Sequence, residues 1–185
     1  MAESVGKIYG TAFFELSDEN GTLEKSFEEL EAVRSLMYDK GNEDMRDLMK
    51  FLCSPLVSGR DKTSVLDGVF GGRISGMTLD LLCLIAEKGR FSSFESICNE
   101  FREMYNQKMN ILEVTAITAM PLNERLEKKL VAKLESVSGK KIVLTKKIDK
   151  SIIGGIVIKY ENSLIDSSVK SRLDKLRAQV SGVIA

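Results

Sequence analysis

The chain has 185 residues, with 27 Lys and Arg against 27 Asp and Glu, so its formal net charge is zero. This balance argues against nucleic acid or an anionic membrane as the main partner, because both attract proteins with a basic excess. There is no histidine, and the three cysteines form no Cys-x-x-Cys spacing. These counts disfavour the usual serine and cysteine triads, most zinc sites and dithiol redox motifs.

The residues after Met1 predict an amphipathic helix, not the basic and apolar succession of a signal peptide. The longest apolar run, 79–86, is interrupted by Asp80. It is much shorter than the ~20 residues that span a bilayer. We therefore expect a soluble protein that inserts no segment into a membrane, and the lack of histidine leads us to expect no metal.

Helical periodicity dominates the first two thirds of the chain, with apolar residues three and four apart and short polar turns between segments. The helices are expected over 5–16, 23–37, 45–52, 58–70, 77–88 and 92–105. Ser58 and Asp61 form a capping-box-like start of the fourth. The fifth has almost no polar face, which is typical of the buried centre of a bundle. Cys53, Cys83 and Cys98 lie on apolar stripes, so we expect them to be small core residues.

The pattern changes period near 106–111. Residues 112–116 and 142–145 are rich in the β-branched side chains that favour strands. Between them we expect a helix that starts at Pro121 and Asn123 and is ended by Gly139. The sequence therefore predicts an α+β protein overall. Its expected parts are an all-α six-helix bundle over 1–107 and a small α+β domain over 108–185.

The most distinctive stretch, 149–173, begins with a glycine pair, Gly154 and Gly155, before an alternating strand. We interpret this pair as a backbone device, either a positive φ or a close approach, because the spacing of a Walker A loop is absent. After a short return strand, Asp166 and Ser168 are expected to cap a helix. The apolar positions of that helix are Val169, Leu173, Leu176 and Val180.

This stretch resembles the signature of the delta subunit of rotary ATP synthases, known in mitochondria as the oligomycin-sensitivity-conferring protein. The shared elements are an Asp, Gly-Gly, a β-branched strand, an Ile-Asp-x-Ser-Val step and a Leu-bearing helix. Weaker similarities cover nearly the whole chain, including an opening helix in which Gly10 replaces the usual Ala. The other similar segments are Ser54-Pro55 followed by Lys62, the Leu-rich 79–90, and 118–122.

The resemblance implies a non-catalytic stator subunit of the proton-translocating ATP synthase that needs no cofactor. It would link the alpha/beta catalytic head to the b subunits of the peripheral stalk, so that rotation is coupled to ATP synthesis. It would work as one copy per complex, peripheral to the cytoplasmic side of a bacterial inner membrane.

The resemblance also implies two binding regions. The helical domain would hold the N-terminal helices of alpha subunits between its first and fifth helices. The contact residues expected there are Tyr9, Ala12, Phe13, Leu79, Leu82 and Cys83. The α+β domain would hold the C-terminal ends of the b subunits. Its expected binding or structural residues are Gly154, Gly155, Asp166 and Ser168.

The residues by themselves leave another function open, a non-catalytic adaptor that binds amphipathic helices in some other assembly. Carboxylate pairs such as Glu28 and Glu29 are interpreted as solvated helix faces with basic neighbours. A group of lysines could form a local basic patch, but we interpret it as solvated strand ends and loops. Its members are Lys140, Lys141, Lys146, Lys147 and Lys150.

Overall fold

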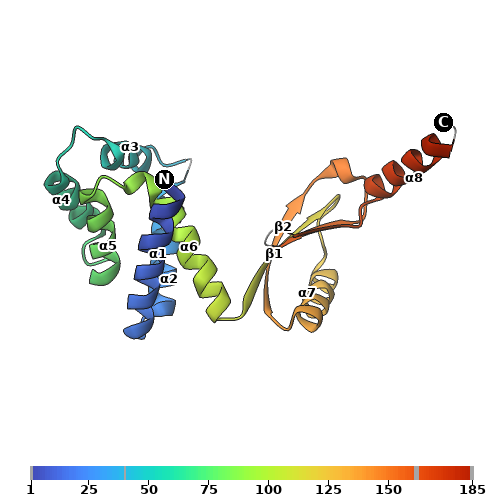
Figure 1. The fold of residues 1–185 in the computed structure, drawn as a ribbon, viewed down its shortest axis with the longest axis horizontal. Helices are drawn as coiled ribbons and strands as arrows, with labels where there is room; N and C mark the ends of the chain where they lie inside the picture. Colours follow the sequence, from blue (N-terminus) through green and yellow to red (C-terminus); the bar gives the residue numbers. More distant parts are fainter. Residues whose placement is uncertain (1, 40, 161–162, 184–185) are drawn as a thin grey trace. The chain divides into compact units, whose positions relative to one another are not determined.

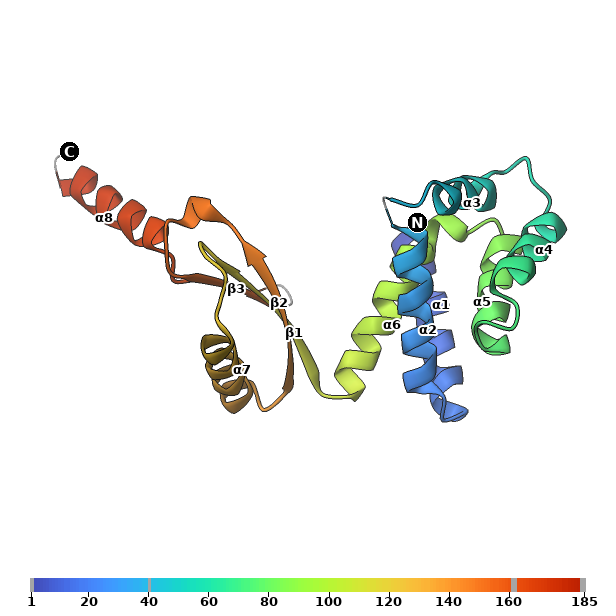
Figure 2. The same cartoon turned by 180° about the vertical axis from the view of Figure 1, so that it is seen from behind.

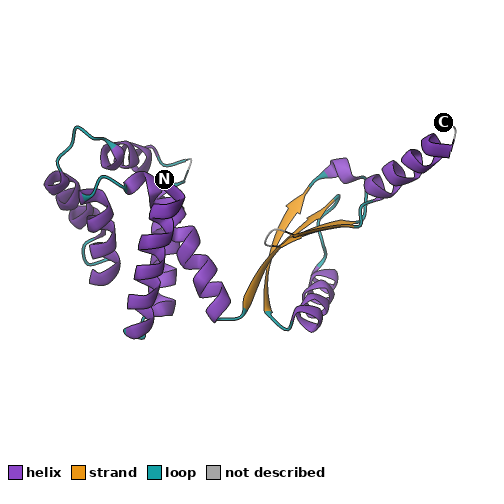
Figure 3. Ribbon diagram, in the orientation of Figure 1, coloured by secondary structure: helices purple, strands orange, loops and turns teal. Residues whose placement is uncertain are grey.

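The computed structural model describes residues 2–39, 41–160 and 163–183, and the side chains of 4–39, 41–160 and 163–177. The chain divides into two compact units, Met1–Tyr105 and Asn106–Ala185. The first is helical and the second combines a sheet with helices (Figure 3). The protein is therefore α+β overall, as the sequence predicts.

Every helix expected from the periodicity of the first unit has a counterpart in the structure. These are α1 (Ala2–Glu19), α2 (Leu23–Met37), α3 (Glu43–Cys53), α4 (Gly59–Phe70), α5 (Gly76–Glu87) and α6 (Phe94–Lys108), with a 3₁₀ turn, η1 (Phe91–Ser93), before the last. Aromatic rings form the centre of the unit. Phe13 and Phe14 of α1 pack against Phe101 of α6, with ring centroids 5.3 and 5.8 Å apart.

Side-chain caps explain where several of these helices begin. The Asn42 side chain accepts a hydrogen bond from the Met45 N–H at the start of α3. Ser58 accepts one from the Asp61 N–H at the start of α4, as its sequence predicts. Each cap satisfies a backbone donor that has no partner within its helix.

Helices α1 and α6 approach each other closely through glycines. A Cβ on Gly6 would lie 2.2 Å from the Ser96 Oγ, and one on Gly10 would lie 2.7 Å from the Glu100 Cβ. Neither distance is compatible with a side chain at these positions, so both glycines are needed for this packing. The close approach is the physical reason for Gly10, the position at which the opening helix departs from the family pattern.

Two expectations about the first unit are wrong. Helix α5 is not enclosed on all sides, because Leu84 is 42% exposed and Asp80 also faces solvent. The cysteines are not all core residues either, since Cys53 is exposed and Cys83 is half-buried. Only Cys98 is buried, and its burial raises the pKa of the thiol to about 12.

The second unit contains a four-stranded sheet in the order β2-β1-β3-β4. The strands are β1 (Ile111–Thr118), β2 (Lys141–Ile148), β3 (Ile156–Tyr160) and β4 (Ser163–Asp166). Strands β1 and β2 are parallel and are connected through α7 (Glu124–Ser138), whereas β3 pairs with β1 and β4 in antiparallel register. Gly139 ends α7 in the left-handed conformation, with φ +66°, as its sequence predicts.

Helix α7 covers one face of this sheet (Figures 1 and 2). The buried strand residues beneath it are Leu112, Val114, Ile142 and Ile158, and the helix contributes Leu130, Val131 and Leu134. On the same face Lys146 of β2 forms an ion pair with Glu127 of α7, with a 2.8 Å distance between Nζ and Oε2. The residues that alternate with these point to the opposite face of the sheet.

Helix α8 (Val169–Val183) follows β4 and leads away from the sheet (Figure 1). It contacts η2 (Lys150–Ile152), the 3₁₀ turn after β2. Three of its apolar positions named from the sequence, Val169, Leu173 and Leu176, are exposed. Val180 lies outside the residues whose side chains are described.

Candidate functional site

An apolar stripe on α1 faces solvent. Tyr9 is half-buried and Ala12 is exposed. Ile8, just before them, is 63% exposed, and Leu16, one turn after Ala12, is 46% exposed. These residues follow the three- and four-residue spacing of one helical face. Phe13 does not belong to this face: it is buried against Phe101 and can offer no surface to a partner. The expected contact role of Phe13 is therefore corrected to core packing.

The contact residues expected on α5 also divide into accessible and buried ones. Leu79 and Cys83 are half-buried and accessible, whereas Leu82 is fully buried and belongs to the core. The expected contact role of Leu82 is corrected for the same reason as that of Phe13. Burial raises the pKa of the Cys83 thiol, and the neighbouring Asp80 and Asp67 carboxylates add to that shift. Cys83 therefore offers a neutral, apolar contact surface.

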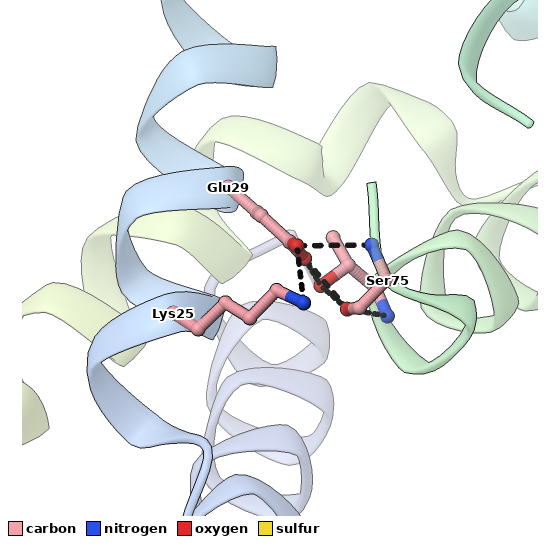
Figure 4. A network of polar contacts seen from close by, with 4 residues as sticks. Lys25, Glu29 and Ser75 are labelled. Atoms are coloured by element: carbon pink, nitrogen blue, oxygen red, sulfur yellow. Dashed lines mark hydrogen bonds and ion pairs between the residues drawn. The ribbon is translucent and has the colours of Figure 1, made fainter. Parts of the chain in front are cut away.

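Glu29 of α2 holds the start of α5 (Figure 4). Its carboxylate accepts hydrogen bonds from the Ser75 N–H and Oγ, at 2.9 and 2.6 Å, and from the Thr78 Oγ1 at 2.6 Å. The Lys25 Nζ lies 3.9 Å from the Glu29 Oε1. Burial opposes ionisation of Glu29, but these hydrogen bonds outweigh it, so its pKa lies below the ordinary value. A negative charge at a helix N-terminus is also favoured by the helix dipole.

Tyr9 has a partner from the loop after α5. The Arg90 guanidinium donates a hydrogen bond to the Tyr9 hydroxyl at 3.1 Å, and its central carbon lies 5.7 Å from the ring centroid. This contact joins the exposed stripe of α1 to the end of α5. Together, Glu29 and Arg90 fix both ends of α5 relative to α1 and α2.

In the second unit, Asp166 and Ser168 cap α8 as expected. The Asp166 carboxylate accepts a hydrogen bond from the Ser168 N–H at 2.8 Å, and the Ser168 Oγ accepts one from the Ser171 N–H at 3.1 Å. These bonds with Ser168 hold the pKa of Asp166 below its ordinary range. Ser168 is buried, so both residues act as structural supports of the β4–α8 connection.

The glycine pair has unequal roles. Gly155 has φ +81°, and a Cβ there would lie 2.5 Å from the Ser167 carbonyl oxygen. Gly154 has only an ordinary contact, 3.5 Å from a Val169 methyl carbon, and no positive φ. The backbone device expected from sequence therefore resides in Gly155 and not in Gly154.

The residue before this pair is strained. Ile153 has φ +66° and ψ −46°, and the Gly154 N–H donates to the Ile152 carbonyl at 2.7 Å, which is the geometry of a γ-turn. A β-branched residue is rare in this region of backbone space. Its side chain is 64% exposed, so packing does not explain its position.

A cavity of about 510 Å³ lies between η2 and the first turns of α8. Its lining mixes Asp166 and Asp174 with Lys170 and Lys175, so it presents no single charge to a ligand. Among the described residues, no group of three or more Cys, Asp or Glu side chains is placed to hold a metal ion. In the same part of the chain, every helix falls short of the length and apolarity needed to cross a bilayer.

Residues 5–180 match the family model described as the ATP synthase delta (OSCP) subunit. The chain belongs to this family. ATP synthase subunit delta of Clostridioides difficile is 32% identical over 185 residues, covering 100% of both chains. The subunit delta of Alkaliphilus oremlandii is 34% identical over 184 residues, covering 100% of this chain and 99% of that protein.

A solved structure has the same fold. A chain in the Toxoplasma gondii mitochondrial ATP synthase hexamer superimposes with a TM-score of 0.72 at 26% identity, covering 95% of this chain and 96% of that one. The delta (OSCP) family is that of a structural subunit of ATP synthase and not of a catalytic one. The absence of a recognisable catalytic constellation from the sequence is consistent with this membership.

The overall charge balance conceals a division that sequence reasoning missed. Met1–Tyr105 carries 12 Lys and Arg against 19 Asp and Glu, a net charge of −7. Asn106–Ala185 carries 15 against eight, a net charge of +7. Counting charges on each side of the expected boundary would have revealed this division. Arg90 and Gly6 were missed for another reason, because their roles depend on neighbours that are distant in sequence. Glu29 was interpreted as part of a solvated helix face, but it is half-buried and accepts hydrogen bonds from Ser75 and Thr78.

Proposed function

We propose that this protein is a non-catalytic stator subunit that links the catalytic head of an F-type ATP synthase to its peripheral stalk. The observation that carries the proposal is the extent of the family match, 5–180, which includes both compact units. A linking subunit needs two attachment regions in one chain. The similarity of full length to subunit delta of Clostridioides difficile supports the same assignment.

In this proposal a six-helix domain over about 1–107 binds the N-terminal helices of alpha subunits. The accessible apolar residues of α1 and α5 form the contact surface: Tyr9, Ala12, Leu79 and Cys83, with Ile8 and Leu16 beside them. An amphipathic helix that buries its apolar face on such a surface is a common mode of peptide recognition. The bonds of Glu29 and Arg90 support this surface by fixing α5.

The α+β domain over about 108–185 binds the C-terminal ends of the b subunits. Binding of the b subunits is supported indirectly by the residues that fix the turn and cap before α8, which are Gly155, Asp166 and Ser168. The protein thereby prevents the alpha/beta hexamer from turning with the rotor. As a peripheral subunit on the cytoplasmic side of the membrane, it works as one copy within the complex.

The test is a titration of the full chain with two partners, an N-terminal peptide of the alpha subunit and a soluble fragment from the C-terminal end of the b subunit. We expect both to bind, and the binding of one to leave a site for the other. The assembled complex should hold the protein with a dissociation constant near 1 nM, about −12 kcal/mol. Failure of both partners to bind, or competition between them for one site, contradicts the proposal.

A further inference from the structure

We propose that the sheet face opposite α7 is a docking surface for one acidic amphipathic helix. This inference rests on the proposed function, because it names the surface and the chemistry of a partner of the second unit. The sheet register decides which side chains share that face.

The pairing places a set of small apolar and β-branched residues on the face away from α7. In register across the strands, Val143 lies beside Glu113, and Thr145, Thr115 and Leu164 occupy one row with Lys159. Val143 is 47% and Leu164 56% exposed. At one end of the face Val157 of β3 is buried, whereas Glu113, Lys159 and the two apolar residues above are exposed.

The same face is basic. Lys141 and Lys147 of β2 and Lys159 of β3 point to this side and are exposed. No ion pair of these three lysines is found among the described residues, whereas Lys146, on the other face, is paired with Glu127. The two carboxylates on the open face are already engaged: Glu113 accepts a hydrogen bond from Asn106, and Asp166 accepts one from the Ser168 N–H.

Charge decides the choice of occupant. The face combines the exposed apolar side chains of Val143 and Leu164 with unpaired lysines, and it belongs to a unit of net charge +7. A helix with an apolar stripe and carboxylates beside it would satisfy both features, whereas a basic helix would be repelled. The opposite net charge of the first unit, −7, would then direct a basic helix there and prevent the two partner helices from exchanging sites.

The experiment uses the full chain and two designed peptides of ~20 residues. Both have the same Leu and Ile stripe, and their polar faces consist of Glu in one and Lys in the other. Binding is measured by fluorescence anisotropy of the labelled peptide. We expect the Glu peptide to bind the protein, and raising the salt from about 50 to about 200 mM to weaken this binding. The negative first unit should attract the Lys peptide to another site, so unlabelled Lys peptide should not displace the labelled Glu peptide. Displacement by the Lys peptide, or failure of the Glu peptide to bind, overturns the inference.

Two triple variants locate the site. Lys141→Glu/Lys147→Glu/Lys159→Glu reverses charge on the open face, and Lys128→Glu/Lys129→Glu/Lys133→Glu makes the same change in net charge on α7. The first should lose at least about tenfold in affinity for the Glu peptide, and the second less than about threefold. Equal losses would show that binding follows net charge and not this face. If the first variant fails to fold, the Lys→Gln triple at the same positions makes the same comparison.

A further variant tests the neighbouring helix. Leu173→Asp alters an exposed apolar residue of α8 and leaves the residues of the strands unchanged. If it abolishes binding of the Glu peptide while the sheet variant binds normally, the site lies on α8 and the inference is wrong. If none of these variants changes the affinity for the Glu peptide, the inference is also wrong. The lysines of β2 would then serve to protect an edge strand from pairing with another chain.

The two proposals fail separately. Competition between the Glu peptide and a b-subunit fragment supports both. If the Glu peptide binds the open face as described but a b-subunit fragment neither binds nor competes, the docking surface stands and the b subunit is not its partner. If the fragment binds normally to the Lys141/Lys147/Lys159 variant, the proposed function stands and this surface is not the one it uses.

Discussion

Glu29 and Ser75 are 46 residues apart in sequence, and their two hydrogen bonds connect α2 to the first turn of α5. Glu29 also accepts from Thr78, so one carboxylate satisfies a backbone donor and two hydroxyls at this helix start. A hydrogen bond to a charged group is stronger than one between neutral groups. We therefore regard Glu29 as the residue that sets the position of α5, which contributes Leu79 and Cys83 to the proposed alpha-binding surface.

Replacing the Glu29 carboxylate by an amide should destabilise the protein. Glu29→Gln loses a charged acceptor and places an NH₂ group against donors, so we expect a loss of about 1–3 kcal/mol in the free energy of unfolding. The measurement is urea unfolding at neutral pH. Glu28→Gln is the matched control, because Glu28 is its exposed neighbour on α2 and should change stability by less than about 0.5 kcal/mol.

The pKa of Glu29 gives this contact a pH dependence. Because the folded-state pKa lies below the ordinary value of 4.5, the contribution of Glu29 is fully present above pH 4.5 and declines as the pH falls through the folded pKa. The unfolding free energy of Glu29→Gln should therefore depend less steeply on pH below 4.5 than that of the wild type. Parallel curves for the two proteins would contradict the assigned role.

Close packing of α1 and α6 leads to a second prediction, at the position where the family pattern has Ala. Gly10→Ala should destabilise the protein by about 1–3 kcal/mol, because the new methyl would overlap the Glu100 Cβ and approach the Ile97 carbonyl at 3.1 Å. Gly68→Ala in α4 is the control. That Cβ would meet no atom within 4 Å, so the variant should gain about 0.5–1 kcal/mol from reduced freedom of the unfolded chain. Thermal unfolding of both variants measures the difference.

The exposed stripe of α1 gives a third prediction. Ala12→Asp should leave the fold intact, since Ala12 faces solvent, and should weaken binding of an alpha N-terminal peptide at least about tenfold by placing a charge in an apolar contact. Thr11→Asp adds the same charge on another side of the helix and should bind normally. Phe13→Ala should instead cost about 3–5 kcal/mol of stability, because Phe13 is a core residue. Wild-type affinity of Ala12→Asp would remove Ala12 from the surface.

Local sequence signals predicted much of the fold and less of the site. Periodicity and caps such as Ser58 and Asn123 act over one or two helical turns, so the sequence itself reveals them. The burial of Phe13 and the exposure of Ala12 were not predictable in the same way. Both lie on one broad apolar face of α1, and which edge of that face is covered depends on α6, about 90 residues later.

Backbone geometry was the least predictable feature. The γ-turn at Ile153 contradicts the residue's own preference, because a β-branched side chain disfavours positive φ. A glycine pair indicates that one position needs special geometry, but not which one. In the structure that position is Gly155, because the carbonyl of Ser167, the residue after β4, lies against it.

The fourth prediction separates the two glycines. Gly155→Ala must hold a Cβ at φ +81° and 2.5 Å from the Ser167 oxygen, so we expect a loss of about 1–3 kcal/mol confined to the second unit. Gly154→Ala should be tolerated, since its Cβ would meet only the Val169 methyl at 3.5 Å. Hydrogen exchange at increasing urea concentration measures the unfolding free energy of each unit separately. It should show a loss in the second unit for Gly155→Ala and none for Gly154→Ala.

The functional consequence of Gly155→Ala should be equally local. Affinity for the b-subunit fragment and coupled ATP synthesis should fall, because the turn before β3 and the cap of α8 share the Ser167–Ser168 segment. Affinity for the alpha N-terminal peptide should remain at the wild-type level, since no described contact of Gly155 lies in the first unit. Equal loss of both affinities would refute the proposed division of labour between the units, and wild-type binding of both partners would show that this turn does not support the stalk site.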